Sequence, residues 1–165
     1  MFAKQMKWNG NPEIGWWLDN DPVRFYHGTH IRNKDGILKE GIFAPESGPT
    51  AGYVSLALEP NTSFAYASMS GAGGESGFRA AGQKAASTPP RERLVLVLDI
   101  PQSYFKTKMA PARGNMEAER TKLTSKSRYE TWAKSNKSDQ EYYQITEIRL
   151  PKHVPAKYIV GYMTK

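Results

Sequence analysis

The sequence has no cysteine among its 165 residues. This absence excludes disulfide bonds, thiolate-bound metals and a cysteine nucleophile, and it is typical of proteins from a reducing compartment. Long apolar runs are also missing, since the longest aliphatic run, residues 94–98, is far too short to span a bilayer. The first 17 residues contain no apolar core of signal-peptide length. We therefore expect a soluble, cytoplasmic protein with no membrane partner.

Several common site motifs are missing as well. The sequence contains no phosphate-binding P-loop, no serine-hydrolase elbow and no internal repeat. Glycines at 71, 73, 74 and 77 follow a predicted helix rather than a strand, which argues against a redox dinucleotide fingerprint. The three histidines, His27, His30 and His153, have no cysteine or carboxylate at metal-ligand spacing, so we expect no metal.

The length predicts one domain over residues 1–165. Within it, residues 1–22 form an N-terminal lead-in. Residues 70–92 are rich in Gly, Ala and Ser, and this composition predicts a mobile loop. Residues 106–137 form a basic segment that we expect to face the substrate.

Apolar runs and turn residues predict both strands and helices. The predicted strands are 23–26, 52–58, 93–100 and 158–163, with a further β-rich run over 141–150. Helices are predicted over 32–40, from residue 60, and within 115–136. Together these elements predict an α+β domain whose core is a split, mostly antiparallel β-sheet with short helices at its flanks.

The first candidate site motif is Tyr26-His27-Gly28-Thr29. A glycine where a strand ends lets the backbone approach a ligand closely, and His27 and Thr29 offer hydrogen bonds to sugar hydroxyls or an amide. With the following helix, which ends Ile-Leu-x-x-Gly-Ile, the motif resembles the histidine-type branch of the ADP-ribosyltransferase superfamily. That branch includes poly(ADP-ribose) polymerases, diphtheria toxin, RNA 2′-phosphotransferases and nucleic-acid-modifying toxins. The resemblance implies that NAD is a co-substrate and that His27, Gly28 and Thr29 bind it.

The second motif contains two tyrosines, Tyr53 in Gly-Tyr-Val-Ser and Tyr66 in Ser-Phe-Ala-Tyr-Ala. Two aromatic faces can stack on a flat, electron-poor ring. By resemblance to the family, Tyr53 and Tyr66 enclose the nicotinamide, and Tyr53 belongs with His27 to the catalytic set. Ser55 lies where the arginine-type branch keeps a structural serine and joins the NAD-binding set. Two ordinary core tyrosines are the alternative interpretation.

The third motif is Glu147, followed by Ile-Arg-Leu-Pro and then Val-Pro-Ala-Lys-Tyr-Ile. It resembles the family's catalytic-glutamate strand. A carboxylate there can stabilise the positive charge that develops on ribose as nicotinamide leaves. Glu141, in Gln-Glu-Tyr-Tyr, is a rival for the same role. Ile145 stands where arginine-modifying relatives carry Gln or Glu, which argues against protein arginine as the acceptor.

The net charge of +7 comes from one half of the chain. Residues 1–90 carry eight basic and eight acidic side chains, whereas 91–165 carry fifteen and eight. Within the basic segment 106–137 there are three acidic residues and nine basic ones, namely Lys106, Lys108, Arg113, Arg120, Lys122, Lys126, Arg128, Lys134 and Lys137. Such an excess attracts polyanions, although a solvated helix face would give the same pattern. We expect Lys122, Lys126 and Arg128 to bind the substrate.

These features favour a mono-ADP-ribosyltransferase that uses NAD, needs no metal, and acts on RNA or DNA. Small size and the resemblance suggest a toxin or phage-conflict effector, for which a cognate inhibitor or antitoxin would be a partner. Three alternatives stay open: transfer to a protein acceptor, NAD-dependent RNA 2′-phosphotransfer, and a non-catalytic relative that binds nucleic acid.

Overall fold

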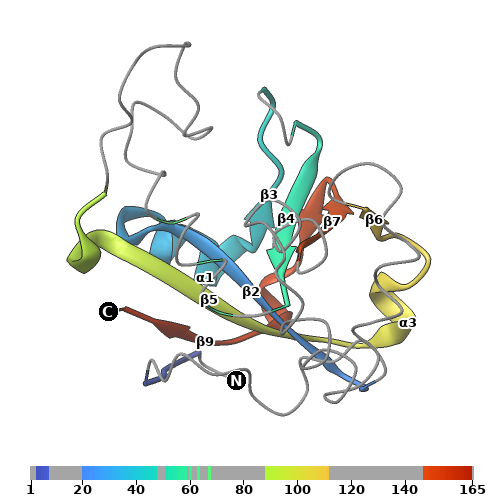
Figure 1. The fold of residues 1–165 in the computed structure, drawn as a ribbon, viewed down its shortest axis with the longest axis horizontal. Coiled ribbons are helices and arrows are strands. Elements are labelled where there is room, and N and C mark those ends of the chain that lie inside the picture. The colour runs from blue at the N-terminus through green and yellow to red at the C-terminus, as the bar shows by residue number, and fades with distance from the viewer. Residues whose placement is uncertain are drawn as a thin grey trace, which may run out of the picture.

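A computed structural model describes residues 3–7, 20–47, 51–58, 60, 63, 67, 88–111 and 147–164 (Figure 1). The strands in these ranges are β1 (Lys4–Gln5), β2 (Val23–His30), β3 (Ile42–Phe43), β4 (Tyr53–Ala57), β5 (Arg93–Ile100), β6 (Ala110–Pro111), β7 (Glu147–Pro151), β8 (His153–Val154) and β9 (Ile159–Met163). The helical segments are η1 (Ile31–Asn33), α1 (Lys34–Glu40), η2 (Pro90–Glu92), α3 (Gln102–Phe105) and η4 (Ala156–Tyr158).

The main sheet has the strand order β1-β9-β5-β2-β4-β7-β6, and β3 pairs with β8 in a separate two-stranded sheet. Within the described residues, every strand pair is antiparallel except β1 with β9, which is parallel. The sheet is therefore mixed but mostly antiparallel. The predicted α+β class is confirmed.

The sheet is split between β2 and β4. Strand β2 pairs with β5 along its whole length, from Val23 to His30, and β4 pairs with β7 from Tyr53 to Ala57. Between β2 and β4, only Tyr26 and Ala57 are in register. Figure 1 shows the consequence: β2 and β5 run together across the molecule, while β4 and β7 rise away from them. The split predicted from the sequence is confirmed.

Strand β5 (RLVLVLDI) is apolar on both faces because both faces are covered. Leu94, Leu96 and Leu98 belong to the larger hydrophobic cluster, whereas Val95 and Val97 pack with Tyr26 and Met163 on the other side. A continuous apolar run is the pattern of a strand buried on two sides. The strand predicted over 93–100 is confirmed at both ends.

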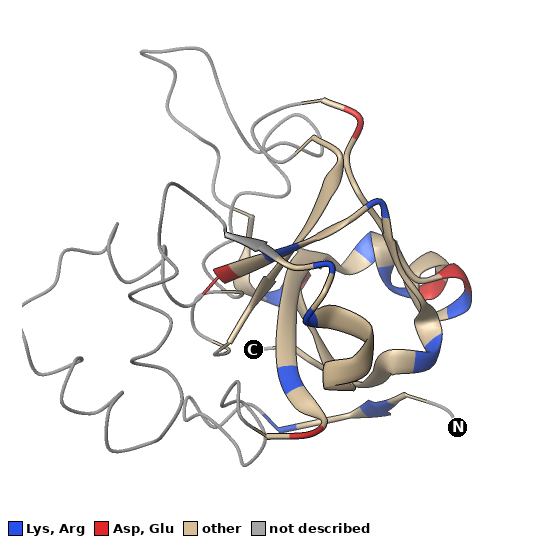
Figure 2. Ribbon diagram, turned by 90° about the vertical axis from the view of Figure 1, so that its right-hand side faces the viewer, with Lys and Arg blue, Asp and Glu red and all other residues tan. Residues whose placement is uncertain are grey.

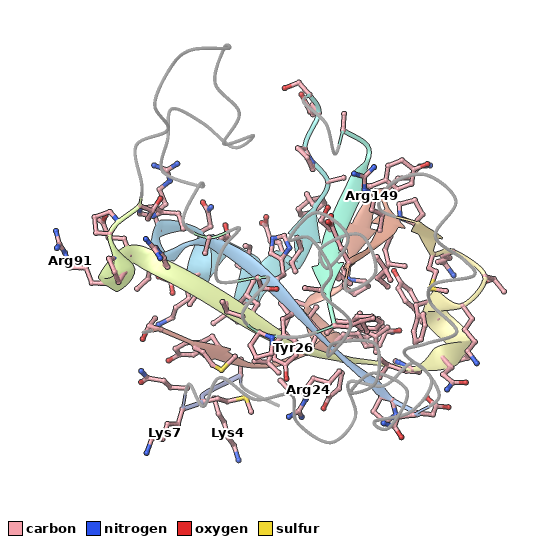
Figure 3. All side chains as sticks on the ribbon, in the orientation of Figure 1. Lys4, Lys7, Arg24, Tyr26, Arg91 and Arg149 are labelled. Carbon is pink, nitrogen blue, oxygen red and sulfur yellow. The ribbon has the colours of Figure 1, made fainter. Side chains whose placement is uncertain are left out.

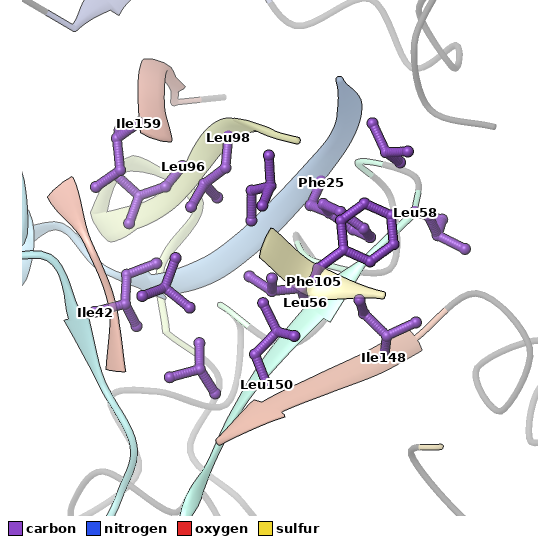
Figure 4. Packing of buried hydrophobic residues seen from close by; sticks show 14 of the residues in the cluster. Phe25, Ile42, Leu56, Leu58, Leu96, Leu98, Phe105, Ile148, Leu150 and Ile159 are labelled. Carbon is purple, nitrogen blue, oxygen red and sulfur yellow. The ribbon is translucent and has the colours of Figure 1, made fainter. Parts of the chain in front are cut away.

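The larger cluster fills the angle between the two halves of the sheet, as Figure 4 shows. Its aromatic centre is an edge-to-face pair of Phe25 and Phe105, with ring centroids 5.1 Å apart. Leu56 of β4 and Ile148 of β7 belong to the same cluster. Alternation along each strand therefore turns the neighbours of these residues to the opposite face.

Some predicted boundaries were wrong. The strand predicted to end at His27-Gly28-Thr29 continues to His30, because β5 pairs with it that far. His27, Gly28 and Thr29 therefore lie within the strand and not at its end. Tyr158 lies in η4, and β9 begins one residue later.

Other predicted boundaries agree with the structure or extend past the described residues. Helix α1 ends at Gly41 as expected, with a φ of 90° that favours glycine. The last residues of the predicted loop 70–92 form η2, and residues 70–87 lie outside the described part. So do 112–137 of the basic segment and 141–146 of the β-rich run.

Candidate active site at the split in the sheet

Three neighbouring strands place Tyr26, Ala57 and Glu147 in one row across the sheet. Adjacent strands are about 4.8 Å apart, so the Cα atoms of Tyr26 and Glu147 are separated by roughly 10 Å. Tyr26 is the last residue of β2 that is in register with β4 before the strands separate. The row therefore brings the first and third sequence motifs together at the split.

Glu147 is buried, with 3% of its surface exposed, and it is the only carboxylate buried to this degree among the described residues. It is the first residue of β7, and Ile148 beside it belongs to the larger hydrophobic cluster. Alternation thus turns Glu147 to the opposite face of the sheet. Carboxylates are seldom placed at such depth, and those that are often serve function.

His27 bridges the split. Its Nδ1 lies 2.8 Å from the carbonyl oxygen of Ser55 on β4. A carbonyl can only accept, so Nδ1 carries the proton and donates it. Burial lowers the pKa of His27 below its ordinary value of 6.5, and the bond to Ser55 only partly opposes this. The ring is therefore neutral at pH 7, and its Nε2 is a hydrogen-bond acceptor.

Gly28 packs closely against a helix, and its predicted contact with NAD stays a prediction. A Cβ on Gly28 would come within 1.8 Å of the backbone oxygen of Ser63 and 2.9 Å of the backbone nitrogen of Ala67. Ser63 and Ala67 are both helical and buried. In the structure, then, a helix backbone occupies the space that a side chain at position 28 would need.

Thr29 is buried, and its Oγ1 accepts a hydrogen bond from Nδ2 of Asn33 at 2.9 Å. This bond joins the end of β2 to η1. The predicted contact of Thr29 with NAD stays a prediction.

The structure does not bring Tyr53 next to Glu147. Tyr53 is in register with Pro151, at the far end of β4 from Ala57, and 38% of its surface is exposed. Four residues of strand separate it from the row of Glu147, which is about 13 Å. The second tyrosine, Tyr66, lies outside the described residues, as do Glu141, Lys122, Lys126 and Arg128.

Sequence reasoning missed one residue of this region. Arg149 is in register with Ser55, two residues along β7 from Glu147. The Nε of Arg149 and the Oγ of Ser55 are both buried, and neither has a hydrogen-bond partner in the described part of the chain. Leaving a buried donor unpaired costs about 1–3 kcal/mol. The signal in the sequence was the spacing of Glu147 and Arg149, because residues two apart in a strand lie on the same face of the sheet.

No helix among the described residues is long and apolar enough to cross a membrane. Within the same ranges, no three His, Cys, Asp or Glu side chains gather where a metal ion could bind. Basic residues lie on several separate elements of the described ribbon, as the blue positions in Figure 2 show.

Solved structures of similar fold include DarT of Thermus sp. 2.9 in complex with carba-NAD+, which is 18% identical, with a TM-score of 0.48 over 85% of this chain and 81% of that chain. The same protein in complex with NAD+ is 19% identical, with a TM-score of 0.46 over 85% of this chain and 80% of that one. No family model matches the sequence, and no curated protein matches it either. At these TM-scores the likeness carries no argument about this chain.

Proposed function

We propose that this chain is a mono-ADP-ribosyltransferase that uses NAD as its substrate. The observation that carries the proposal is the position of Glu147, a buried carboxylate in the same cross-strand row as Tyr26, at the split that His27 bridges. The three segments that resemble the superfamily supply Glu147, His27 and Tyr53.

The reaction breaks the bond between the nicotinamide nitrogen and C1′ of ribose, and the bonding electron pair leaves with nicotinamide. Positive charge then develops at C1′, and the carboxylate of Glu147 stabilises it and accepts a hydrogen bond from the 2′-hydroxyl. The acceptor's nucleophile forms a new bond to C1′, and its proton is released to water. None of these reaction steps requires a metal ion.

The neutral imidazole of His27 serves binding rather than proton transfer in this proposal. Its Nδ1 is committed to Ser55, so Nε2 is left to accept a hydrogen bond from a ribose hydroxyl of NAD. Gly28 and Thr29 contribute through the backbone of β2. Tyr66, and Tyr53 if it turns inward, would stack on nicotinamide.

The acceptor that we favour is RNA or DNA. The support is the basic segment 106–137, which precedes the strand of Glu147 and carries nine basic residues against three acidic ones. A polyanion would be steered toward such a segment. Such an activity would suit a toxin or a phage-conflict effector. A cognate inhibitor would then be a partner of this protein.

The test is a comparison of Glu147→Gln with wild type in NAD consumption and label transfer. Glutamine keeps the shape and removes the charge, so turnover should fall by roughly a hundredfold or more while folding is kept. Glu40→Gln removes an exposed carboxylate at the end of α1 and is the matched control. Near-normal turnover in Glu147→Gln with loss in Glu141→Gln would move the catalytic role to Glu141. A wild-type protein that neither consumes NAD nor labels any acceptor would overturn the transferase.

A further inference from the structure

Arg149 has no role in the proposed chemistry, and its neighbour Ser55 was placed in the NAD-binding set only by resemblance. They are in register on β4 and β7, so their side chains leave the same face of the sheet. Glu147 lies two residues from Arg149 on that face, about 7 Å along the strand. Figure 3 shows Arg149 where β4 and β7 run side by side, far from Arg91.

Both side chains present donors. The Nε–H of Arg149 and the hydroxyl of Ser55 are shielded from solvent and have no hydrogen-bond partner in the described ranges. A guanidinium is cationic, and its fork of N–H groups matches an oxyanion. Two neighbouring buried donors, one of them on a cationic side chain, are complementary to an anion with several acceptor oxygens.

We propose that Ser55 and Arg149 form a phosphate-binding subsite beside Glu147. Phosphate is the anion that both proposed substrates carry: NAD has a diphosphate, and a nucleic acid has a phosphodiester backbone. The identification of NAD or nucleic acid as the source of the phosphate rests on the proposed function. The pairing of the two donors rests on the structure alone. Through it, Arg149 positions a substrate phosphate relative to the carboxylate of Glu147.

Direct binding of inorganic pyrophosphate, measured by calorimetry without turnover, tests the subsite. Wild type should bind it, and Arg149→Gln should bind at least about tenfold more weakly, because a charge-assisted fork is lost. Ser55→Ala should weaken binding by a smaller factor. Arg91→Gln removes the same charge from an exposed position in η2 and should bind as wild type does. Absence of binding to wild type, or equal binding by wild type and Arg149→Gln, overturns the subsite.

Two further measurements identify the source of the phosphate. If the subsite takes the diphosphate of NAD, then NAD competes with pyrophosphate, and Arg149→Gln raises the KM for NAD in hydrolysis without acceptor. If it takes an acceptor phosphate, then a single-stranded oligonucleotide competes and the KM for NAD is unchanged. If neither NAD nor the oligonucleotide competes with pyrophosphate, the proposal that the subsite binds a substrate phosphate is overturned.

Folding is controlled with a second variant. Arg149→Lys keeps the charge but has no Nε–H, so it should bind pyrophosphate with intermediate affinity. Should Arg149→Gln fail to fold, wild-type affinity in both Arg149→Lys and Ser55→Ala overturns the proposal. The result of the pyrophosphate experiment is independent of the test for transferase activity. A catalytically inactive protein can still bind pyrophosphate, and an active protein can fail to bind it.

Discussion

The imidazole of His27 and the backbone of Ser55 meet across the split in the sheet, with Nδ1 2.8 Å from the carbonyl oxygen. Strands β2 and β4 are in register only at Tyr26 and Ala57. The hydrogen bond from His27 therefore adds a side-chain link between two strands whose backbones pair at a single position. The same bond fixes which ring nitrogen holds the proton, because the carbonyl can only accept. The hydrogen bond that links β2 to β4 therefore also determines which nitrogen of the His27 ring is protonated.

Acidification should destabilise the fold through His27. Burial lowers the pKa of His27 below 6.5, so as the pH falls the unfolded chain binds a proton before the folded one does. The contribution of this group to stability is complete above pH 6.5. It is lost as the pH falls toward the folded pKa, by at most about 1.4 kcal/mol per pH unit. Denaturant unfolding at a series of pH values from neutral to mildly acidic measures it.

The matched control is His27→Asn. An asparagine amide can donate to Ser55 from nearly the same place as Nδ1, but it does not titrate. The free energy of unfolding of His27→Asn should therefore depend less on pH over this range than that of wild type. Equal pH slopes would mean that His27 is protonated as readily in the folded chain as in the unfolded one.

Gly28→Ala should destabilise the protein strongly. The new Cβ would come within 1.8 Å of the backbone oxygen of Ser63, and a helix backbone cannot move aside as a flexible side chain can. We expect a loss of about 3 kcal/mol or more in the free energy of unfolding. Gly36→Ala is the control, because nothing lies within 4 Å of its Cβ and alanine favours helix α1 by about 0.5–1 kcal/mol. Equal stability of the two variants would contradict this packing.

The strands with unambiguous patterns could be predicted from the sequence. Strand β5 has eight residues with apolar side chains on both faces and a proline directly after it, and its bounds were found without error. Glu147 was singled out because the residues after it resemble the family's catalytic-glutamate strand. The structure places Glu147 as the first residue of β7, and its catalytic role stays a prediction. For β5 the local pattern and the tertiary environment agree.

The rest depends on contacts that are distant in sequence. Strand β2 runs through Gly28 and Thr29, where the sequence predicted its end, because β5 provides a partner for every residue. The requirement for glycine at position 28 comes from the backbone of Ser63, 35 positions later, which no local pattern contains. Arg149 was given no role from the sequence, since its buried Nε, without a partner in the described ranges, is visible only once β4 lies beside β7.

His27→Ala should weaken the binding of NAD. The change removes the Nε2 acceptor and also the link to Ser55, so both a ligand contact and the position of β4 are lost. Tyr66→Ala should weaken binding too if the ring stacks on nicotinamide, by roughly tenfold for an aromatic stack of 1–1.5 kcal/mol. Calorimetry with a non-hydrolysable NAD analogue measures both affinities. Unchanged affinity in the two variants would rule out the proposed NAD contacts.

The basic segment should give nucleic-acid binding a steep dependence on salt. Each Lys or Arg that neutralises a phosphate releases a counterion, so reversing the charge of Lys122, Lys126 and Arg128 together should reduce the slope of log affinity against log salt by up to about 3. The control reverses three exposed basic residues elsewhere, namely Lys4 in β1, Lys7 two residues after β1, and Arg91 in η2, all labelled in Figure 3. NAD hydrolysis without acceptor should survive both changes, because none of the proposed NAD contacts is among the substituted residues. The measurement is label transfer from NAD to separate RNA, DNA and protein pools across a salt series. Label that appears only on protein, at a rate indifferent to added nucleic acid, would refute the nucleic-acid acceptor and leave the transferase standing.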